Sequence, residues 1–312
     1  MKVVYIAGSG RSGSTMLDNI LGQLDGWVSV GEVRFLWERG ILEDRRCGCG
    51  EAFHACPFWT AVLARAFGTG GTADPHRMLA LLDRGTRARR IPMLLGAARR
   101  RRFVRGLNGL PEALGALYRA IAQESGARVI VDSSKLPTYG AVLGEVPGID
   151  LRVVHLVRDP RAAAFSWLRE KPLPDRPGAS MQRQSALRSS VLWTLWNGAT
   201  GAFWRRGPAL LRLRYEDIVV RPREAVARIA ALAGEPTAGG GPFVGDTEVL
   251  LAPSHGVAGN PSRFTTGRVH LRPDDAWRTQ MRPADRRVVR LVTWPLRRRL
   301  GYAGRGPGSG SG

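Results

Sequence analysis

Short runs rich in Val and Ile recur along the chain and alternate with stretches of helical periodicity. The runs lie at residues 2–8, 27–30, 128–132, 151–159 and 209–215. Each is mostly apolar instead of alternating strictly with polar residues, which is typical of strands buried on both faces of a parallel sheet. Helical patterns directly follow the first run, as GSTMLDNILGQL, and the fourth, as PRAAAFSWLRE. This alternation predicts a three-layer α/β fold with a mostly parallel central sheet.

Two segments depart from the alternation. Residues from about 37 to 125 hold a cysteine-rich stretch and mostly helical, arginine-laden sequence, so we expect a helical insertion that covers the ligand edge of the sheet. The end of the chain, GRGPGSGSG, has too little apolar content to pack. A length of 312 residues accommodates one large domain of this kind. We therefore predict a single α/β domain over residues 1–303 and a flexible tail over 304–312.

The first predicted strand runs into a glycine-rich loop, GSGRSGST, at residues 8–15. From Gly8 the spacing is that of a nucleotide-binding P-loop, but Ser14 stands where an NTPase carries Lys. A strand, a glycine turn and a helix together point backbone N–H groups at an anion, and hydroxyl and guanidinium groups add donors. The alternative is a tight turn that binds nothing. We predict a phosphate or sulfate site formed by Gly10, Arg11, Ser12, Gly13, Ser14 and Thr15.

The same architecture returns at residues 151–167, where an apolar strand is followed by RDPRAAAFSW. Asp159 and Pro160 suit the start of a helix. Arg158 lies at the end of the strand and Ser166 follows eight residues later, about two turns into the helix. Both side chains are expected to converge on one anion. Two such loops on one sheet predict a ligand with two separated anionic groups.

In their order and context the two loops resemble those of the PAPS-dependent sulfotransferases, whose donor is 3′-phosphoadenosine 5′-phosphosulfate (PAPS). In that family a loop of the R-S-G-[ST]-[ST] type holds the 5′-phosphosulfate, and an Arg and a Ser eight residues apart bind the 3′-phosphate. The resemblance implies a P-loop-type fold, PAPS as the donor substrate and no requirement for a metal. It also implies an enzyme that transfers a sulfuryl group to a hydroxyl, or an amine, of a small molecule, glycan or lipid.

Two later segments extend the resemblance. LRLRYEDIVVRP at 211–222 is similar to the Y-E-D-[ILV] segment of the family, which implies that Tyr215 lies near the nucleotide. SHGVAGNPSRF at 254–264 is similar to a late G-N-P-x-R loop of bacterial members, which implies a phosphate contact for Arg263. Acceptor pockets in this family come from variable insertions. The unmatched segment 57–125 is therefore expected to supply the acceptor site.

Sulfuryl transfer requires positioning, cations for the transferring oxygens and a base for the acceptor proton. Arg11 and Lys135, the latter just beyond a predicted strand in VIVDSSKLP, are the candidate cations. Glu32 follows the second strand in VSVGEVRFL and matches a G-E segment that carries the base in the tyrosylprotein branch of the family. An ion pair between Glu32 and Arg34 or a neighbouring Arg is the alternative. His155 and His255 are further candidate bases. A simpler explanation is that His155 belongs to a buried strand and that His255 orders its loop by hydrogen bonding.

The segment CGCGEAFHACPFW places Cys47, Cys49, His54 and Cys56 within ten residues. Four such side chains suit zinc, but C-x-C departs from the C-x₂₋₄-C spacing of zinc modules. Similar cysteine patches occur in bacterial sulfotransferases. A zinc site, a redox-dependent disulfide and packed free thiols remain open, and none of them implies a catalytic role.

The chain is strongly basic: 47 Lys and Arg residues against 26 Asp and Glu give a formal net charge of +21. This favours anionic ligands, nucleic acid or an acidic membrane surface. Only three basic residues are lysines, so a bias toward Arg explains much of the excess. The Arg-rich run at 84–106 is interpreted as a solvated helical face, with membrane attachment or recognition of an acidic or lipid-linked acceptor as the alternative. No nucleic-acid-binding signature accompanies the charge, so no specific nucleic acid partner is expected.

Further features of the sequence indicate where in the cell the protein is located. No run approaches the roughly 18 apolar residues of a membrane span, and the N-terminus has no signal-peptide pattern. Three clustered cysteines do not make a secreted disulfide framework, so we expect a cytoplasmic protein.

The competing enzyme is a P-loop kinase or NTPase with Asp132, at the end of VIVD, holding Mg²⁺. That alternative must explain the missing Lys, for which Arg11 is a poor geometric substitute.

Overall fold

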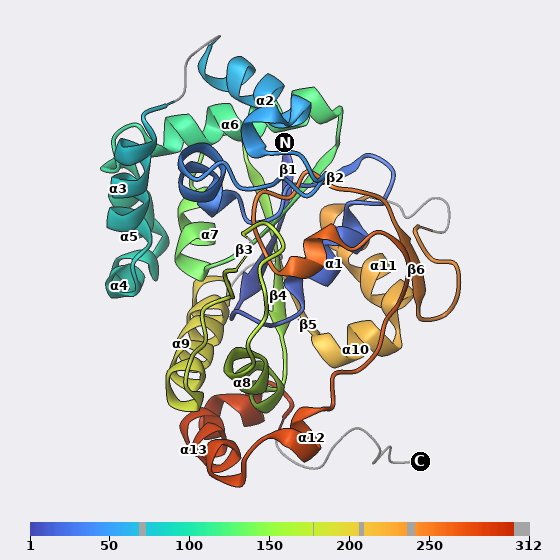
Figure 1. Ribbon diagram of the computed structural model, residues 1–312. Coiled ribbons are helices and arrows are strands. Elements are labelled where there is room, and N and C mark those ends of the chain that lie inside the picture. Colours follow the sequence, from blue (N-terminus) through green and yellow to red (C-terminus); the bar gives the residue numbers. More distant parts are fainter. Residues whose placement is uncertain (69–72, 177, 206–208, 236–240, 303–312) are drawn as a thin grey trace.

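A five-stranded sheet with all strands parallel forms the centre of the molecule (Figure 1). The computed structural model describes residues 1–68, 73–176, 178–205, 209–235 and 241–302. Within the sheet the strand order is β2-β3-β1-β4-β5. The strands are β1 (Lys2–Gly8), β2 (Trp27–Ser29), β3 (Val129–Lys135), β4 (Asp150–Val157) and β5 (Leu210–Arg214).

All five predicted strands are present, which confirms the predicted α/β class with a parallel sheet. The ends differ by a few residues. The third strand continues past the predicted end to Lys135, which itself has a φ of +66°. The fourth strand stops at Val157, so that Arg158 is the first residue beyond it. Polar residues at a strand end carry no periodic signal, and therefore the hydrophobic pattern alone misses these positions.

Side chains of β1 alternate between two hydrophobic cores, one on each face of the sheet. Val3 and Tyr5 are buried in one core, and Val4 and Ile6 are buried in the other. Helices α1 (Ser14–Leu21), α10 (Tyr215–Val220) and α11 (Pro222–Ala233) cover the second face. The first face is covered by α6 (Leu110–Ser125), α7 (Pro137–Leu143) and α9 (Ala186–Phe203). The three layers of the prediction are therefore present.

Residues 36–125 are mostly helical, as expected, but they pack against α7 and the β3 side of the sheet (Figure 1). No described residue of 57–125 lines the cavity at the ligand edge, so the expectation that this segment covers that edge is wrong. The helical elements of the segment before α6 are η2 (Leu36–Leu42, π-helical), η3 (Phe53–Ala55), α2 (Pro57–Phe67), α3 (Pro75–Thr86), η4 (Ala88–Arg90), α4 (Ile91–Leu94) and α5 (Ala97–Arg105).

The last third of the chain closes the ligand edge from the other side. Strands β6 (Glu248–Leu251) and β7 (Gly267–His270) form a separate antiparallel pair, and the loop between them contains η5 (Pro261–Phe264). Helices α12 (Trp277–Gln280) and α13 (Pro283–Arg299) pack against α8 (Pro160–Leu168). The remaining short turn is η1 (Val33–Phe35). The predicted tail at 304–312 lies outside the described residues.

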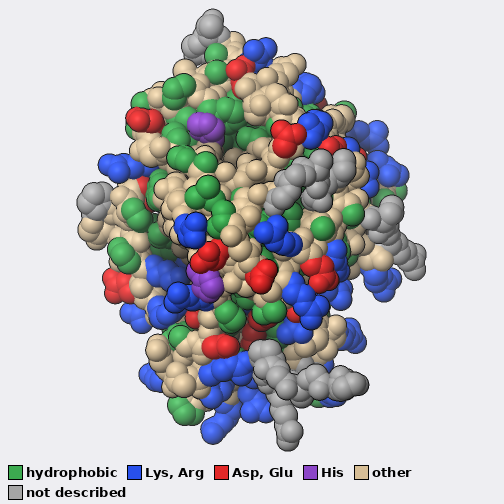
Figure 2. Space-filling model, turned by 90° about the vertical axis from the view of Figure 1, so that its right-hand side faces the viewer, with side chains coloured by type: hydrophobic (Ala, Val, Ile, Leu, Met, Phe, Trp, Pro, Cys, Tyr) green, Lys and Arg blue, Asp and Glu red, His purple; other side chains and the backbone are tan. Residues whose placement is uncertain are grey.

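The positive charge is dispersed on the surface that Figure 2 shows, where Lys and Arg side chains are interspersed with acidic and apolar ones. The Arg-rich run at 84–106 forms the end of α3, η4, α4 and α5, and the side chains of Arg101, Arg102 and Arg105 are exposed. These observations agree with a solvated helical face. Among the described helices, none combines the length and apolar character needed to cross a membrane.

Candidate active site

One cavity of about 450 Å³ lies at the carboxyl edge of the sheet, where parallel α/β folds bind their ligands. Its lining includes six basic side chains but only two acidic ones, those of Glu32 and Asp274. Ten of the twelve residues predicted for the site line this cavity: Gly10, Arg11, Gly13, Ser14, Thr15, Glu32, Lys135, Arg158, Ser166 and Tyr215. Segments far apart in sequence therefore meet around one cationic cavity.

The loop of residues 8–15, called here the first anion loop, joins β1 to α1. Its glycines are needed sterically: a Cβ on Gly10 would lie 2.6 Å from Trp167 Cζ2, and one on Gly13 would collide with the Tyr215 ring. Gly13, at φ +89°, is the N-cap of α1 and supplies no side-chain hydrogen bond to the helix. The first N–H groups of α1 are therefore left without a side-chain cap, which is the arrangement that binds anions.

Arg11 extends from this loop into the cavity. Its guanidinium group lies 4.6 Å from the Trp167 ring, and its Nη1 contacts Met181 Sδ at 3.1 Å. Its Nε and Nη2 are buried and have no hydrogen-bond partner among the described residues. Burial, which Glu32 partly offsets, and the nearby charges of Arg158 and Arg169 lower the pKa of Arg11 to about 10. A guanidinium group with free buried donors and cationic neighbours favours an anionic ligand.

The segment Arg158–Ser166, called here the second anion loop, joins β4 to α8, so the two loops follow neighbouring strands. Arg158 and Ser166 both line the cavity, as predicted. Arg158 Nη1 donates to the carbonyl oxygen of Arg11 at 3.1 Å, which links the two loops directly. Its Nη2 lies 2.8 Å from Asp274 Oδ2. The second loop thus holds a cation that a carboxylate of the protein already neutralises.

Glu32 and Lys135 form an ion pair, with Oε1 and Nζ 2.6 Å apart. The partner of Glu32 is therefore a lysine and not an arginine such as Arg34. Glu32 is buried, and both side chains line the cavity. The positive φ of Lys135 turns the chain at the end of β3, and its Nζ also donates to the carbonyl oxygen of Ser133 at 3.1 Å. The pair places a candidate proton acceptor beside a cation.

Tyr215 lines the cavity, and Arg158 lies over its ring at 4.4 Å. Two predicted binding residues lie elsewhere. Ser12 is buried but does not line the cavity, and its Oγ has no partner in the described part of the chain. Arg263 is also outside the lining, because its guanidinium group pairs with the buried Asp175 at 2.8 Å. Arg263 therefore orders its loop and does not reach into the cavity.

Sequence reasoning missed several residues of the cavity. Trp167 follows Ser166 directly, and Asn260 belongs to the G-N-P motif, so both lay beside recognised positions. Lys171 also lines the cavity; as one of three lysines it carried a compositional signal. Burial and the charge of Arg11 lower the pKa of Lys171. No feature of the sequence marked Asp274 as a cavity residue, because a single Asp in a loop cannot be distinguished by sequence from an Asp exposed to solvent.

Asp132 and His155, the candidate Walker B aspartate and an alternative base, make other contacts within the described part of the chain. Asp132 is fully buried, accepts hydrogen bonds from Tyr118 and Ser134, and does not line the cavity. Burial raises its pKa to about 6. A Walker B aspartate must face the nucleotide, so this geometry disfavours the NTPase alternative. His155 is buried in β4 against Asn197 Oδ1, at 3.0 Å, and burial lowers its pKa to about 4.

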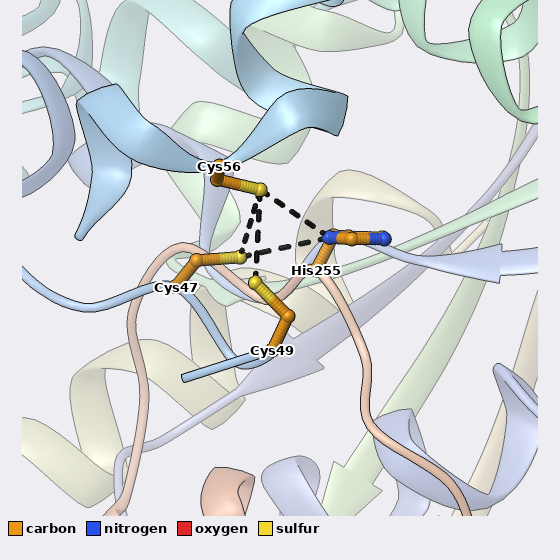
Figure 3. Close-up of side chains that lie close together, drawn as sticks. All are labelled: Cys47, Cys49, Cys56 and His255. Atoms are coloured by element: carbon orange, nitrogen blue, oxygen red, sulfur yellow. Dashed lines mark hydrogen bonds between the residues drawn. The ribbon is translucent and has the colours of Figure 1, made fainter. Parts of the chain in front are cut away.

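The three cysteines lie together as free thiols, but their histidine neighbour is not the expected one (Figure 3). His54 points away, with Nε2 2.9 Å from the carbonyl oxygen of Ile41. His255, from the loop after β6, turns its Nδ1 toward the thiols instead. Burial raises the pKa of the Cys47 and Cys56 thiols and lowers that of His255. None of the four lines the cavity, so His255 is not placed to act as the base.

One known protein family matches most of the chain. A model of the sulfotransferase family matches residues 4–239, and no curated protein sequence matches the chain. Among solved structures, the sulfotransferase domain of the Synechococcus PCC 7002 olefin synthase is 20% identical, with a TM-score of 0.47 over 93% of this chain and 94% of that one. The sulfotransferase domain from the curacin biosynthetic pathway is 17% identical, with a TM-score of 0.49 over 95% and 97% of the two chains.

Proposed function

The chain belongs to the sulfotransferase family, and we propose that it transfers a sulfuryl group from PAPS to a hydroxyl, or an amine, of a small-molecule, glycan or lipid acceptor. The observation that carries this proposal is the opening of both anion loops onto one cationic cavity. PAPS has a 5′-phosphosulfate and a 3′-phosphate on one adenosine, so it presents two separated anionic groups to two separated sites.

The placement of the donor follows from the difference between the loops. The first anion loop offers uncapped N–H groups of α1 and the free donors of Arg11, which suit the 5′-phosphosulfate. Arg158 and Ser166 suit the 3′-phosphate at the opposite end. Tyr215 packs between them, against Gly13 and Arg158, and borders the nucleotide.

In the proposed reaction the acceptor oxygen attacks the sulfur atom in line with the bond to the 5′-phosphate oxygen. A new S–O bond forms, the old one breaks, and 3′-phosphoadenosine 5′-phosphate leaves with the bonding electrons. Glu32 takes the proton of the acceptor, while Lys135 and Arg11 neutralise charge on the transferring and leaving oxygens. The 2.6 Å separation of Glu32 and Lys135 supports this division of roles, because proton transfer and charge development occur at neighbouring atoms.

The acceptor is expected to enter beside η1 and η2 and not through the segment 57–125. Arg34, Phe35 and Arg39 line that part of the cavity, and both guanidinium groups lie over the Phe35 ring, at 4.3 and 3.8 Å. An aromatic ring flanked by cations suits an acceptor that has an apolar body and an acidic group.

A two-step experiment tests the proposal. Incubating the purified protein with ³⁵S-labelled PAPS and extracts of small molecules, glycans and lipids should label a product, which mass analysis then identifies. The Glu32→Gln variant should give a rate roughly 10²–10⁴-fold lower, as expected for loss of a base. Glu38→Gln, at an exposed position nearby, is the matched control and should leave the rate unchanged.

Binding of 3′-phosphoadenosine 5′-phosphate tests the second anion loop separately from turnover. Replacing Arg158 by Ala together with Ser166 by Ala should weaken binding by roughly two orders of magnitude, because charge-assisted hydrogen bonds to the 3′-phosphate are lost. Equal affinity in the wild type and the double variant would remove this loop from the proposal.

A further inference from the structure

Three cysteines and one histidine from two distant segments converge on one point (Figure 3). Cys47, Cys49 and Cys56 lie between η2 and α2, whereas His255 lies in the loop after β6. These four residues are called the Cys3His cluster. Cys47 and Cys56 are buried, and the other two are half-buried. The cluster lies outside the cavity, so its four side chains are not placed to contact the substrates there.

Four of the six distances between the ligand atoms of the cluster are close to those of a tetrahedral zinc site. With Zn–S bonds of about 2.3 Å and a Zn–N bond of about 2.0 Å, two sulfur ligands lie about 3.8 Å apart, and a sulfur and a nitrogen lie about 3.5 Å apart. Cys56 Sγ lies 3.7 Å from both Cys47 Sγ and Cys49 Sγ. His255 Nδ1 lies 3.8 Å from Cys47 Sγ and 3.5 Å from Cys56 Sγ. All four ligand atoms lie within 4.8 Å of one another.

A disulfide explains this arrangement less well. Its sulfur atoms would lie about 2.05 Å apart and would involve two of the three cysteines. Here Cys56 is equidistant from both other thiols, and an imidazole nitrogen completes the group. Packed free thiols do not require a histidine nitrogen directed at them. The geometry favours a shared central ligand over any one pair.

The surrounding backbone explains how the unusual C-x-C spacing can supply two ligands. Gly50 N donates to the carbonyl oxygen of Cys47 at 2.9 Å, and the positive φ of Gly50, +100°, closes a turn that brings both thiols to one side. Gly48 N donates to the carbonyl oxygen of Gly256 at 3.0 Å, so the turn is hydrogen-bonded to the loop that carries His255. A Cβ on Gly48 would lie 2.7 Å from the carbonyl oxygen of Ser254.

The histidine is held from two sides. The Phe58 ring stacks on the imidazole of His255, with centroids 4.5 Å apart and an interplanar angle of 18°. Trp59 Nε1 donates to the carbonyl oxygen of His255 at 2.9 Å. Outer contacts of this kind orient the ligands of metal sites. The sequence CPFW therefore supplies one ligand and two residues that position another.

We propose that the Cys3His cluster binds one structural zinc ion through three thiolates and Nδ1 of His255. On binding, the thiols release their protons to solvent. Four protein ligands complete a tetrahedral shell and leave no position for substrate, so the ion takes no part in group transfer. Three sulfur ligands and one imidazole favour zinc over magnesium or calcium, which prefer oxygen ligands.

The ion links the cysteine segment to a loop that contacts the active site. Two residues after His255, Val257 N donates to the carbonyl oxygen of Val30 at 3.1 Å. Further along the same loop, Asn260 N donates to Thr15 Oγ1 at 3.3 Å, in the first anion loop. Zinc therefore stabilises the position of this loop against the donor site.

Metal analysis of the purified protein tests the proposal without reference to activity. Protein prepared in zinc-supplemented medium, with reductant and without chelator, should contain one zinc per chain by inductively coupled plasma mass spectrometry. Cys56→Ser and His255→Ala should lose most of it. His54→Ala is the matched control, because His54 lies in the same segment but bonds Ile41, and it should retain the full amount.

A second measurement covers the case in which the ligand variants do not fold. Replacement of zinc by cobalt in the wild type should give thiolate-to-cobalt charge-transfer absorption and the visible bands of tetrahedral cobalt. Wild-type protein with little zinc and no cobalt spectrum, or with a disulfide in its intact mass under these reducing conditions, contradicts the proposal. So does loss of zinc in His54→Ala together with its retention in His255→Ala.

Discussion

The two anion loops follow neighbouring strands and lead into helices, yet they present different groups to the cavity. In the first, Gly13 caps α1 without a side chain, so the helix N-terminus itself is free to bind an anion. In the second, Asp159 caps α8, its carboxylate accepting from Arg161 N at 2.8 Å. One N–H group at the N-terminus of α8 is thus already bonded to a side chain of the protein. In the proposed complex the second loop therefore binds its anion mainly through the side chains of Arg158 and Ser166.

The charges differ in the same way. Two nitrogens of Arg11 are buried without a partner among the described residues, whereas Arg158 has one such nitrogen, Nε, and its Nη2 is paired with Asp274. The first loop is therefore preorganised for an anion. The second has to exchange a carboxylate of the protein for a phosphate of the ligand. We expect the first loop to supply binding energy to the group that reacts. The second loop is expected to discriminate between nucleotides with and without a 3′-phosphate.

Among the changes that distinguish the two loops, the largest effect is expected from removing the cation of the first loop, Arg11. Asn is the suitable replacement for Arg11, because the φ of +63° is tolerated better by Asn than by Ala. Arg11→Asn should lower kcat/KM for PAPS by roughly 10²–10³-fold, the usual cost of losing one transition-state donor. Initial rates measured over a range of PAPS concentrations give this value.

Arg152→Ala is the control for that measurement. Arg152 lies on β4 at the end of the strand away from the cavity and pairs with Asp150 at 2.9 Å. It should leave kcat/KM unchanged. If both variants lost activity equally, the effect of Arg11 would reflect general charge or stability and not its place in the first anion loop.

A smaller effect concerns the helix that carries the first loop. Asp18 of α1 is buried and accepts from Ser29 Oγ at 2.6 Å, and burial raises its pKa to about 8. In the unfolded chain the pKa is about 3.9. Between these values the folded state keeps a proton that the unfolded state releases, so the free energy of unfolding should fall as pH rises from about 4 to about 8.

Asp18→Asn removes this titration and should flatten the pH dependence, with a relative gain of roughly 3–4 kcal/mol between pH 5 and pH 8. Urea unfolding at the two pH values measures it. The second anion loop has no comparable buried acid in its helix α8, so Ser166→Ala should show the wild-type slope. Parallel curves for wild type and Asp18→Asn would contradict the assignment.

The smallest effect is expected at the carboxylate that competes for the second loop. Asp274→Asn should tighten binding of 3′-phosphoadenosine 5′-phosphate roughly fivefold, because Asp274 is only partly buried and a like charge next to the phosphate is removed. Isothermal titration at low salt detects such a change, and the gain should shrink at high salt. Adenosine 5′-phosphosulfate, which lacks the 3′-phosphate, should bind both proteins equally; weaker nucleotide binding by the variant would argue against competition.

Local motifs were predictable from sequence because one strand, one turn and one helix determine their geometry. The first anion loop and the pair of Arg158 and Ser166 are of this kind, and the buried strands that place them have a strong apolar pattern. Arg263, in contrast, does not line the cavity, because it pairs with Asp175, which is 88 residues away in sequence. No local pattern reveals which arginine of a basic chain a distant buried carboxylate will pair with.

The same limit applies to the cysteine segment. Proximity in sequence suggested His54, whereas His255 reaches the thiols from a loop about 200 residues later, beside Cys56 at 3.5 Å. The helical insertion shows the same limit, because its helices α3 to α6 pack against α7 and no described residue of 57–125 lines the cavity. Tertiary packing determines which distant residues pair, and the hydrophobic periodicity of a single sequence carries no information about such pairs.

A crystal structure with bound 3′-phosphoadenosine 5′-phosphate is the strictest test of the proposed donor site. We expect the 5′-phosphate within hydrogen-bond distance of the N–H groups at the start of α1, and the 3′-phosphate on Arg158 and Ser166 with Asp274 displaced. A nucleotide that engages only one of the two loops, or that leaves Arg158 paired with Asp274, would contradict it.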